Sequence, residues 1–318
     1  MKPYEIVGEL KRFDRRNVAF ARSHSEADHP ARRAKRPTAE ELIASGKEGF
    51  GRADFALQAG SRVVDGSLRG QLGQVQTPPE GAAPWQPGDA AELTARVKQA
   101  AELFGAADVG VTRVNPLWVY AAGEGEGESP VLTAGLLTAV VMTIEMDYDL
   151  IATSPGVGAS AATGMGYSQM AATAVSMASM LVSLGFSALP SGNDTALSVP
   201  LAIDAGLGEG GRNGNLIARR HGPRVRLCKV FTDAPLATDE PIDLGVRATC
   251  GGCEKCADAC PVGAIARGEP TAAGPTPSNN PGPVKWYANP DKCLAFWAVN
   301  GTNCSNCIRS CPFNRPPG

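Results

Sequence analysis

The stretch CGGCEKCADACP, residues 250–261, decides how the C-terminal part of the chain folds. Its cysteines follow the order C-x2-C-x2-C-x3-C-P, which is the spacing of bacterial ferredoxins that carry two [4Fe–4S] clusters. A second run, from Cys293 to Cys311, also ends in Cys-Pro and has ten residues inserted between its first two cysteines. The sequence therefore predicts a C-terminal ferredoxin-like module with two clusters.

The spacing also predicts which cysteines share a cluster. In such modules three cysteines of one run bind a cluster, and the fourth reaches to the other cluster. The three closely spaced thiolates bind three corners of one cubane. The longer x3 spacing before the last cysteine directs its sulfur towards the second cluster. We therefore expect Cys250, Cys253, Cys256 and Cys311 to bind one cluster, and Cys293, Cys304, Cys307 and Cys260 to bind the other.

A disulfide framework and zinc sites are the two other interpretations of so many cysteines. Disulfide-bonded cysteines would be more scattered along the chain, and zinc sites rarely end both runs in Cys-Pro. The ninth cysteine, Cys228, lies in an apolar stretch and is expected to be a small buried hydrophobic residue. The iron–sulfur interpretation is therefore favoured.

The charge of the chain is close to neutral, with 30 basic against 32 acidic residues among 318. This balance gives no electrostatic reason to expect nucleic acid or an anionic membrane surface as a partner. No apolar run reaches the roughly 18 residues that a membrane span requires. Arg15 and Arg16 are not followed by an apolar stretch, so we interpret them as surface charges and not as a twin-arginine signal.

Upstream of the cysteines, amphipathic helices alternate with apolar strands. This alternation predicts an α+β fold of mixed α/β layers. We expect three parts: an irregular N-terminal segment that packs on the core (1–95), the core (96–245) and the cysteine module (246–318). Helices are expected at 89–105, 167–184 and 195–206, and strands at 107–114, 135–146, 186–190 and 223–232.

The stretch GLGEGG, residues 206–211, has the G-x-G-x-x-G order of dinucleotide sites. Such a site needs a strand before the glycines and a helix after them, whereas here a helix-like stretch precedes them. We therefore expect these glycines to let the backbone approach another bulky cofactor. The small residues of 156–166, GVGASAATGMG, similarly suggest a roomy cavity.

Several motifs together resemble the corrinoid-dependent reductive dehalogenases of anaerobic organohalide respiration. They are MGYSQM (165–170), LPSGND (189–194), LSVPLAIDAGLGEGGRNG (197–214), HGPRVRLCKVFTDAPL (221–236), PIDLGV (241–246) and the two cysteine runs. The resemblance covers residues 105–315. It implies a nitroreductase-like core that binds a corrinoid, cobalamin or a relative, in the base-off state. It also implies that electrons pass through the two clusters to cobalt, whose Co(I) state attacks a halogenated substrate.

The resemblance assigns roles to individual residues. Tyr167 matches the proton donor, and Asn193 and Arg226 match its polar partners. A phenol, with an ordinary pKa of about 10, donates a proton only if the phenolate is stabilised, and a nearby guanidinium does this. Leu227 and Trp297 match residues that line the substrate cavity. Corrinoid contacts are expected at Thr195, Ser198, Pro200, Gly206, Gly208, Gly211, Arg212, Gly214 and His221.

The resemblance also implies partners and a location. The partners are a small halogenated organic substrate, an upstream electron donor and a membrane-anchor protein, with no nucleic acid. Exported family members carry a twin-arginine signal, and none is found in this sequence. We therefore expect either the mature form of an exported enzyme or a cytoplasmic relative.

Two other functions fit parts of the sequence. An epoxyqueuosine reductase-like enzyme has the same cofactors but acts on a tRNA base, so it would need a basic RNA-facing surface and an acidic proton donor. The near-neutral charge and Tyr167 disfavour it. A non-catalytic electron-transfer or corrinoid-carrier protein would need the cysteines but not the set of Tyr167, Asn193 and Arg226.

Overall fold

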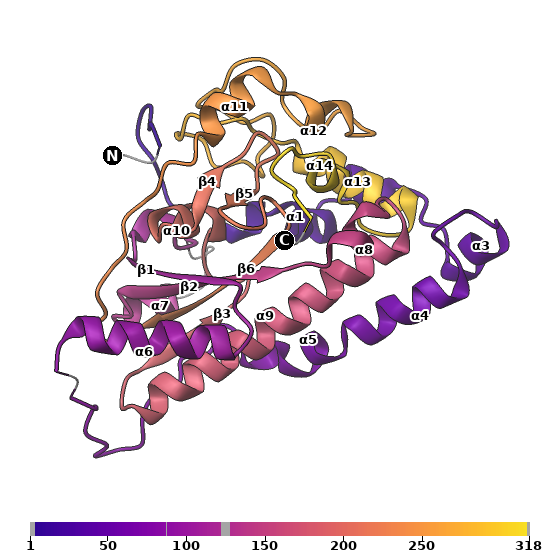
Figure 1. The fold of residues 1–318 in the computed structure, drawn as a ribbon. Helices are drawn as coiled ribbons and strands as arrows, with labels where there is room; N and C mark the ends of the chain where they lie inside the picture. Colours follow the sequence, from indigo (N-terminus) through magenta and orange to yellow (C-terminus); the bar gives the residue numbers. More distant parts are fainter. Residues whose placement is uncertain (1–3, 87, 122–127, 317–318) are drawn as a thin grey trace.

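A four-stranded antiparallel sheet forms the centre of the computed structural model, which describes residues 4–86, 88–121 and 128–316 (Figure 1). Its strands lie in the order β1 (Asp108–Arg113), β2 (Thr138–Glu145), β6 (Val225–Thr232) and β3 (Ala188–Ser191). Val140 of β2 pairs with Val111 on one side and with Val230 on the other. All four strands therefore come from the predicted core.

Helices cover both faces of this sheet. On one face lie α9 (Val157–Ser183) and α6 (Ala90–Leu103); on the other lie α10 (Ser198–Asp204), α7 (Pro130–Thr133) and the 3-10 helix η3 (Pro116–Trp118). Side chains alternate along each strand, so Cys228 faces α9 whereas Leu227 faces α10. Each face thus has its own buried core, and the predicted α+β layering is confirmed.

Helix α9 is longer than predicted, because the small residues of 156–166 form its first turns instead of lining a cavity. They let α4 (Arg52–Ser61) and α5 (Val63–Leu68) approach closely along α9. A Cβ atom added to Gly164 would lie 2.4 Å from Ser61 Oγ. The expectation of a roomy cavity is wrong, and tertiary packing outweighs the poor helix propensity of glycine here.

The N-terminal segment is helical, and the prediction that it is irregular is wrong. Its helices have only three to ten residues, too few for a clear period of 3.6 residues, and capping side chains such as Thr38 define them locally. They are η1 (Arg15–Asn17), α1 (Ala19–Ser25), α2 (Pro30–Arg33), α3 (Ala39–Ala44), α4, α5 and η2 (Arg69–Gln71).

The cysteine module lies beyond one end of the sheet (Figure 1). Its short helices are α11 (Val246–Gly252), α12 (Lys255–Asp258), α13 (Pro290–Asn300) and α14 (Asn306–Arg309). The hairpin of β4 (Gly208–Gly210) and β5 (Leu216–Ala218) and the helix α8 (Tyr148–Ala152) lie between this module and the sheet. Because β4 follows a helix and pairs with β5, the GLGEGG stretch does not form a dinucleotide-binding turn.

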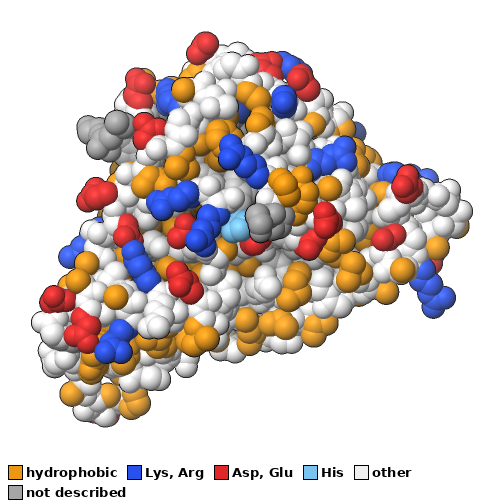
Figure 2. Space-filling view, in the orientation of Figure 1, with side chains coloured by type: hydrophobic (Ala, Val, Ile, Leu, Met, Phe, Trp, Pro, Cys, Tyr) orange, Lys and Arg blue, Asp and Glu red, His pale blue; other side chains and the backbone are white. Residues whose placement is uncertain are grey.

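The described residues form no membrane-spanning helix, and the face of the molecule in Figure 2 carries charges of both signs. Among the described residues no helix is both long and apolar enough to cross a bilayer. Figure 2 shows basic and acidic side chains interspersed over the face in view. This mixture agrees with the nearly balanced charge of the sequence.

Candidate functional site

The first predicted set of cysteines lies around one small cavity. Cys250, Cys253 and Cys256 come from the first run, and Cys311 comes from the end of the second. The structure therefore brings together the four residues that the spacing grouped, including the one exchanged between the runs. Burial raises the pKa of the Cys256 thiol to about 11, and the neighbouring Cys311 adds to this effect.

The second set, Cys260, Cys293, Cys304 and Cys307, gathers beside the first. Burial raises the pKa of the Cys293 thiol to about 12, and the nearby Cys304 and Cys260 raise it further. Burial also raises the pKa of the Cys307 thiol, and its three partners and Cys256 of the first set add to this effect. The two sets are therefore neighbours, as an electron-transfer path requires.

The chemistry of these thiols fits [4Fe–4S] clusters. All nine cysteines are free of disulfide bonds. In the part of the chain that the structure describes, no three His, Cys, Asp or Glu side chains converge as a site for a single ion. In a [4Fe–4S] cubane each thiolate binds a different iron, so the four sulfurs stand around the whole cluster and do not converge on one metal ion. Buried thiols with raised pKa values also need the positive charge of a metal to ionise.

Arg212 holds the loop of the first cysteine set. Its fully buried guanidinium donates hydrogen bonds from Nε to the carbonyls of Cys250 (3.1 Å) and Cys253 (2.9 Å), and from Nη1 to those of Ala266 (3.0 Å) and Gly268 (3.1 Å). All of its donors are engaged within the protein. The Arg212 side chain therefore fastens the cysteine loop to the β4–β5 hairpin, and its predicted contact with a corrinoid stays a prediction.

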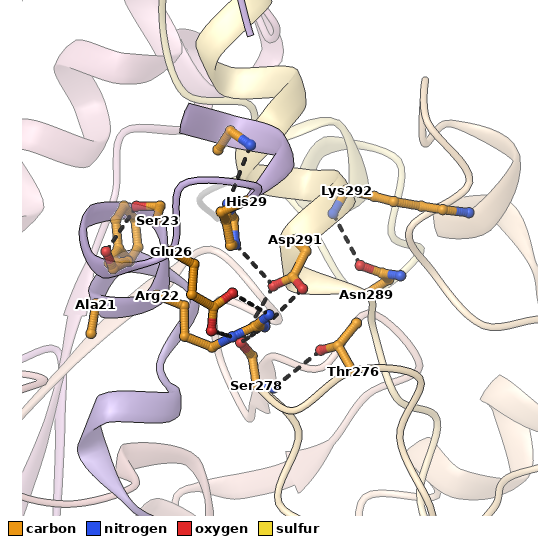
Figure 3. Close-up of polar contacts among 12 residues, drawn as sticks. Ala21, Arg22, Ser23, Glu26, His29, Thr276, Ser278, Asn289, Asp291 and Lys292 are labelled. Carbon is orange, nitrogen blue, oxygen red and sulfur yellow. Dashed lines mark hydrogen bonds and ion pairs between the residues drawn. The ribbon is translucent and has the colours of Figure 1, made fainter. Parts of the chain in front are cut away.

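A buried polar network ties the N-terminal helices to the second set (Figure 3). Arg22 Nη1 donates to Asp291 Oδ2 (2.8 Å), and His29 Nε2 lies 3.3 Å from Asp291 Oδ1. Asp291 lies in the first turn of α13, the helix that carries Cys293. Trp297, on the same helix, packs against Phe20 of α1, with the ring centroids 5.9 Å apart. The structure thus places Trp297 in this interface, and its predicted contact with substrate stays a prediction.

Tyr167, Asn193 and Arg226 lie together although they come from three elements. Asn193 Nδ2, in the loop after β3, donates to Tyr167 Oη at 3.4 Å. The Arg226 guanidinium, on β6, lies over the Tyr167 ring, 5.1 Å from its centroid. Tyr167 and Arg226 are half-buried, and Asn193 is exposed. The arrangement places a cation and an amide donor around one phenol.

Leu227 does not share this site. It packs with Trp118 and Leu201 on the α10 face of the sheet, because neighbouring residues of a strand point to opposite faces. Arg226 faces α9, and a Cβ atom added to Gly166 of that helix would lie 2.9 Å from Arg226 Cγ. In this structure the sheet therefore separates Leu227 from Tyr167, and the predicted place of Leu227 in a substrate cavity stays a prediction.

Buried apolar side chains connect the Tyr167 site with the second cysteine set. Arg226 Nε lies 3.3 Å from the sulfur of Met146. Met146 forms a buried cluster with Ile151, Ala162 and Ile308, and Cys307 packs against that cluster. The route from the cysteines to the phenol therefore passes through one packed layer of side chains.

The glycines predicted to contact a corrinoid are required by the protein's own packing. A Cβ atom added to Gly206 would lie 2.5 Å from the Glu240 carbonyl oxygen, and one added to Gly208 would lie 2.2 Å from the Ile217 carbonyl oxygen. Gly211 is crowded by the Ile217 side chain, and Gly214 has a left-handed φ of 78° in the β4–β5 turn. Contacts of these glycines with a cofactor stay predictions.

The remaining predicted corrinoid contacts lie near α10 and β6. Thr195 and Ser198 belong to the loop and first turn before Pro200, next to Asn193. His221 Nδ1 lies 3.2 Å from Glu145 Oε1, and burial lowers the pKa of His221 while Glu145 opposes that effect.

Each of the three histidines has a polar neighbour within the protein. His221 Nδ1 lies next to Glu145, His29 lies beside Asp291, and His24 Nδ1 contacts the Phe20 carbonyl at 2.6 Å.

Two sets of four cysteines, each completed by the other run, define a double-cluster iron–sulfur module. A family model described as a 4Fe-4S double cluster binding domain matches residues 249–314. The tetrachloroethene reductive dehalogenase of Desulfitobacterium hafniense is 48% identical over 180 residues, which are 55% of this chain and 33% of that protein. The enzyme of the same name from Sulfurospirillum multivorans is 33% identical over 290 residues, 82% of this chain and 57% of that protein.

Solved structures agree with these relatives. A catabolic reductive dehalogenase in complex with 3-bromo-4-hydroxybenzoic acid superimposes with a TM-score of 0.79 at 25% identity, over 98% of this chain and 43% of the other. A structure described as suggesting a mechanism for B12-dependent dehalogenation has a TM-score of 0.77 at 25% identity, over 99% and 43%. The chain belongs to the reductive dehalogenase family. It spans about a third to somewhat over half of the length of these two curated relatives.

Proposed function

We propose that the protein is a reductive dehalogenase that replaces a carbon–halogen bond by a carbon–hydrogen bond. The reaction consumes two electrons and one proton and releases a halide ion. The observation that carries the proposal is the contact of Tyr167 with both Arg226 and Asn193, beside a packed route from a set of four cysteines. An electron carrier alone would not need this arrangement.

Tyr167 is the proton donor in this proposal. Loss of its proton leaves a phenolate, which the Arg226 cation over the ring stabilises electrostatically. The Asn193 amide, which already donates to Tyr167 Oη, binds the charged oxygen more strongly than the neutral one. Proton donation by such a positioned group contributes about 100-fold to 10,000-fold to a rate.

The cofactors would supply the electron chemistry. The eight cysteines would hold two [4Fe–4S] clusters, which provide one-electron transfer. Thr195 and Ser198 would be among the residues that hold a corrinoid, which would supply the low-valent cobalt chemistry for cleavage of the carbon–halogen bond. Met146 and Ile308 fill the space between Cys307 and Arg226 and exclude water from it.

The substrate is proposed to be a small halogenated organic compound. One solved relative binds a brominated hydroxybenzoic acid, and two curated relatives are named for tetrachloroethene. The nearly balanced charge of the sequence, and the mixed charges of the one face shown in Figure 2, give no electrostatic support for a tRNA substrate. An upstream electron donor completes the proposed reaction, because each turnover needs two electrons from outside.

Anaerobic reconstitution with iron, sulfide and cobalamin tests the proposal. We expect about eight irons and one cobalt per chain, and halide release from a panel of chlorinated ethenes and bromophenols. Tyr167→Phe should lower turnover by about 100-fold or more. Tyr148→Phe is a matched control, because Tyr148 also lies under an arginine, Arg224, but on α8.

Four outcomes would contradict the proposal. Iron without cobalt would remove the corrinoid, and both metals without halide release would favour a carrier protein. Full turnover by Tyr167→Phe would remove the proton donor, whereas an equal loss in Tyr148→Phe would show that the effect is not local.

A further inference from the structure

Lys229 is a buried cation that the proposed reaction does not yet use. It lies on β6, three residues after Arg226, and its side chain is fully buried. Its Nζ donates hydrogen bonds to the Gly192 carbonyl, to Ser198 Oγ (3.0 Å) and to the Ala196 carbonyl (3.4 Å). Gly192 and Ala196 belong to the loop between β3 and α10 that also carries Asn193, and Ser198 is the first residue of α10.

A chain of hydrogen bonds leads from this lysine to the phenol. Lys229 Nζ donates to Ser198 Oγ, Ser198 Oγ donates to Asn193 Oδ1 at 3.3 Å, and Asn193 Nδ2 donates to Tyr167 Oη at 3.4 Å. Every donor in the chain points away from the lysine and towards the phenol oxygen. Hydrogen bonds aligned in this way polarise one another, so the last acceptor gains most when it becomes negative.

We propose that Lys229 is a positioning residue that, through Ser198 and Asn193, stabilises the negative charge on Tyr167 after proton transfer. The inference rests on the proposed function, because it takes Tyr167 as the proton donor. Two cations then act on one phenol by different routes. Arg226 acts directly over the ring, and Lys229 acts through the hydrogen-bond chain at the oxygen.

The charged and titratable groups around Lys229 leave it a cation at neutral pH. Burial lowers the pKa of Lys229 to about 8, while Asp194, in the same loop as Asn193, opposes this effect. The adjacent Cys228 thiol stays neutral, because burial raises its pKa to about 12. At the far end of the hydrogen-bond chain, Arg226 is the cation that faces Tyr167. The contribution of Lys229 should therefore fade as the pH rises through about 8.

The carbon signal of Tyr167 reports on Lys229 while the phenol is still neutral. The oxidised holoprotein, labelled with 13C at tyrosine Cζ, has only five such resonances, and Tyr167→Phe identifies the relevant one. We expect this resonance to shift as the pH rises through about 8, because Lys229 then loses its proton and the hydrogen-bond chain to the phenol weakens. Lys229→Met should abolish this shift, and so should Ser198→Ala, which breaks the chain without removing the buried charge. Lys98→Met is the control, because Lys98 pairs with Asp239 on the far side of α6.

Each outcome decides the inference. A shift of the Tyr167 resonance near pH 8 that Lys229→Met and Ser198→Ala lose, but Lys98→Met keeps, supports it, and a shift that both chain variants keep, or no shift in the wild type, overturns it. If Lys229→Met does not fold, Ser198→Ala alone decides in the same way. Absence of halide release by the wild type would contradict the proposed function, whereas the measured dependence of Tyr167 on Ser198 and Lys229 would stand.

Discussion

Burial of Lys229 predicts an unusual dependence of stability on pH. Burial lowers the pKa of Lys229 in the folded protein to about 8, against an ordinary value of 10.5. In the unfolded chain the ammonium keeps the ordinary value. Between these two pH values the unfolded state therefore binds one proton more than the folded state, and stability rises with pH.

The magnitude of this change in stability follows from the two pKa values of Lys229, folded and unfolded. One pH unit corresponds to about 1.4 kcal/mol, so the contribution of Lys229 across the window from pH 8 to 10.5 is about 3 kcal/mol. Below pH 8 both states carry the charge, and the folded protein bears the full cost of burying it. The three hydrogen bonds to the β3–α10 segment offset part of that cost.

Anaerobic denaturant unfolding of the holoprotein at several pH values from 7 to 10.5 measures this contribution. Lys229→Met should lose it, so the free energy of unfolding of the variant should rise less with pH than that of the wild type, by about 1.4 kcal/mol per pH unit within the window. Lys35→Met, which changes an exposed lysine, is the control. Equal slopes for the wild type and Lys229→Met would refute the reasoning.

Three further predictions concern packing around the clusters. Arg212→Gln should loosen the Cys250 loop and lower the bound iron from about eight to about four per chain, measured by iron analysis; retention of all eight would contradict the assigned role. Asp291→Ala should destabilise the folded protein by about 1–3 kcal/mol, because it removes the acceptor that Arg22 and His29 share, although Arg22 keeps its pair with Glu26; an unchanged denaturation midpoint would refute this. Gly208→Ala should destabilise by about 1–3 kcal/mol, since its Cβ atom meets a backbone oxygen, whereas Gly210→Ala should change little.

The sequence predicts best what local spacing determines. The exchange of Cys260 and Cys311 between the two sets could be inferred because the ligand pattern repeats within short runs. The strands could be inferred because their apolar residues are nearly continuous. The grouping of Tyr167, Asn193 and Arg226 came from the resemblance to a family, since nothing local relates three residues so far apart.

Burial of charged residues is what the sequence did not reveal. Arg212 and Lys229 belong to residue types that are rarely fully buried, so sequence reasoning assigned one to a cofactor and gave the other no role. Their positions depend on carbonyl groups that only the folded backbone brings together. The first turns of α9 were missed for a related reason, because glycine and alanine become favourable only where another helix approaches closely.

The exchange of cysteines between the two runs has a consequence for the order of synthesis. Three members of the first set are complete once Cys256 has left the ribosome, but the fourth, Cys311, follows 55 residues later. The second set likewise waits for Cys307, although Cys260 is made early. Neither cluster can gain its full set of ligands until the second run has been synthesised. Completion of both clusters should therefore wait until the chain has been made as far as Cys311.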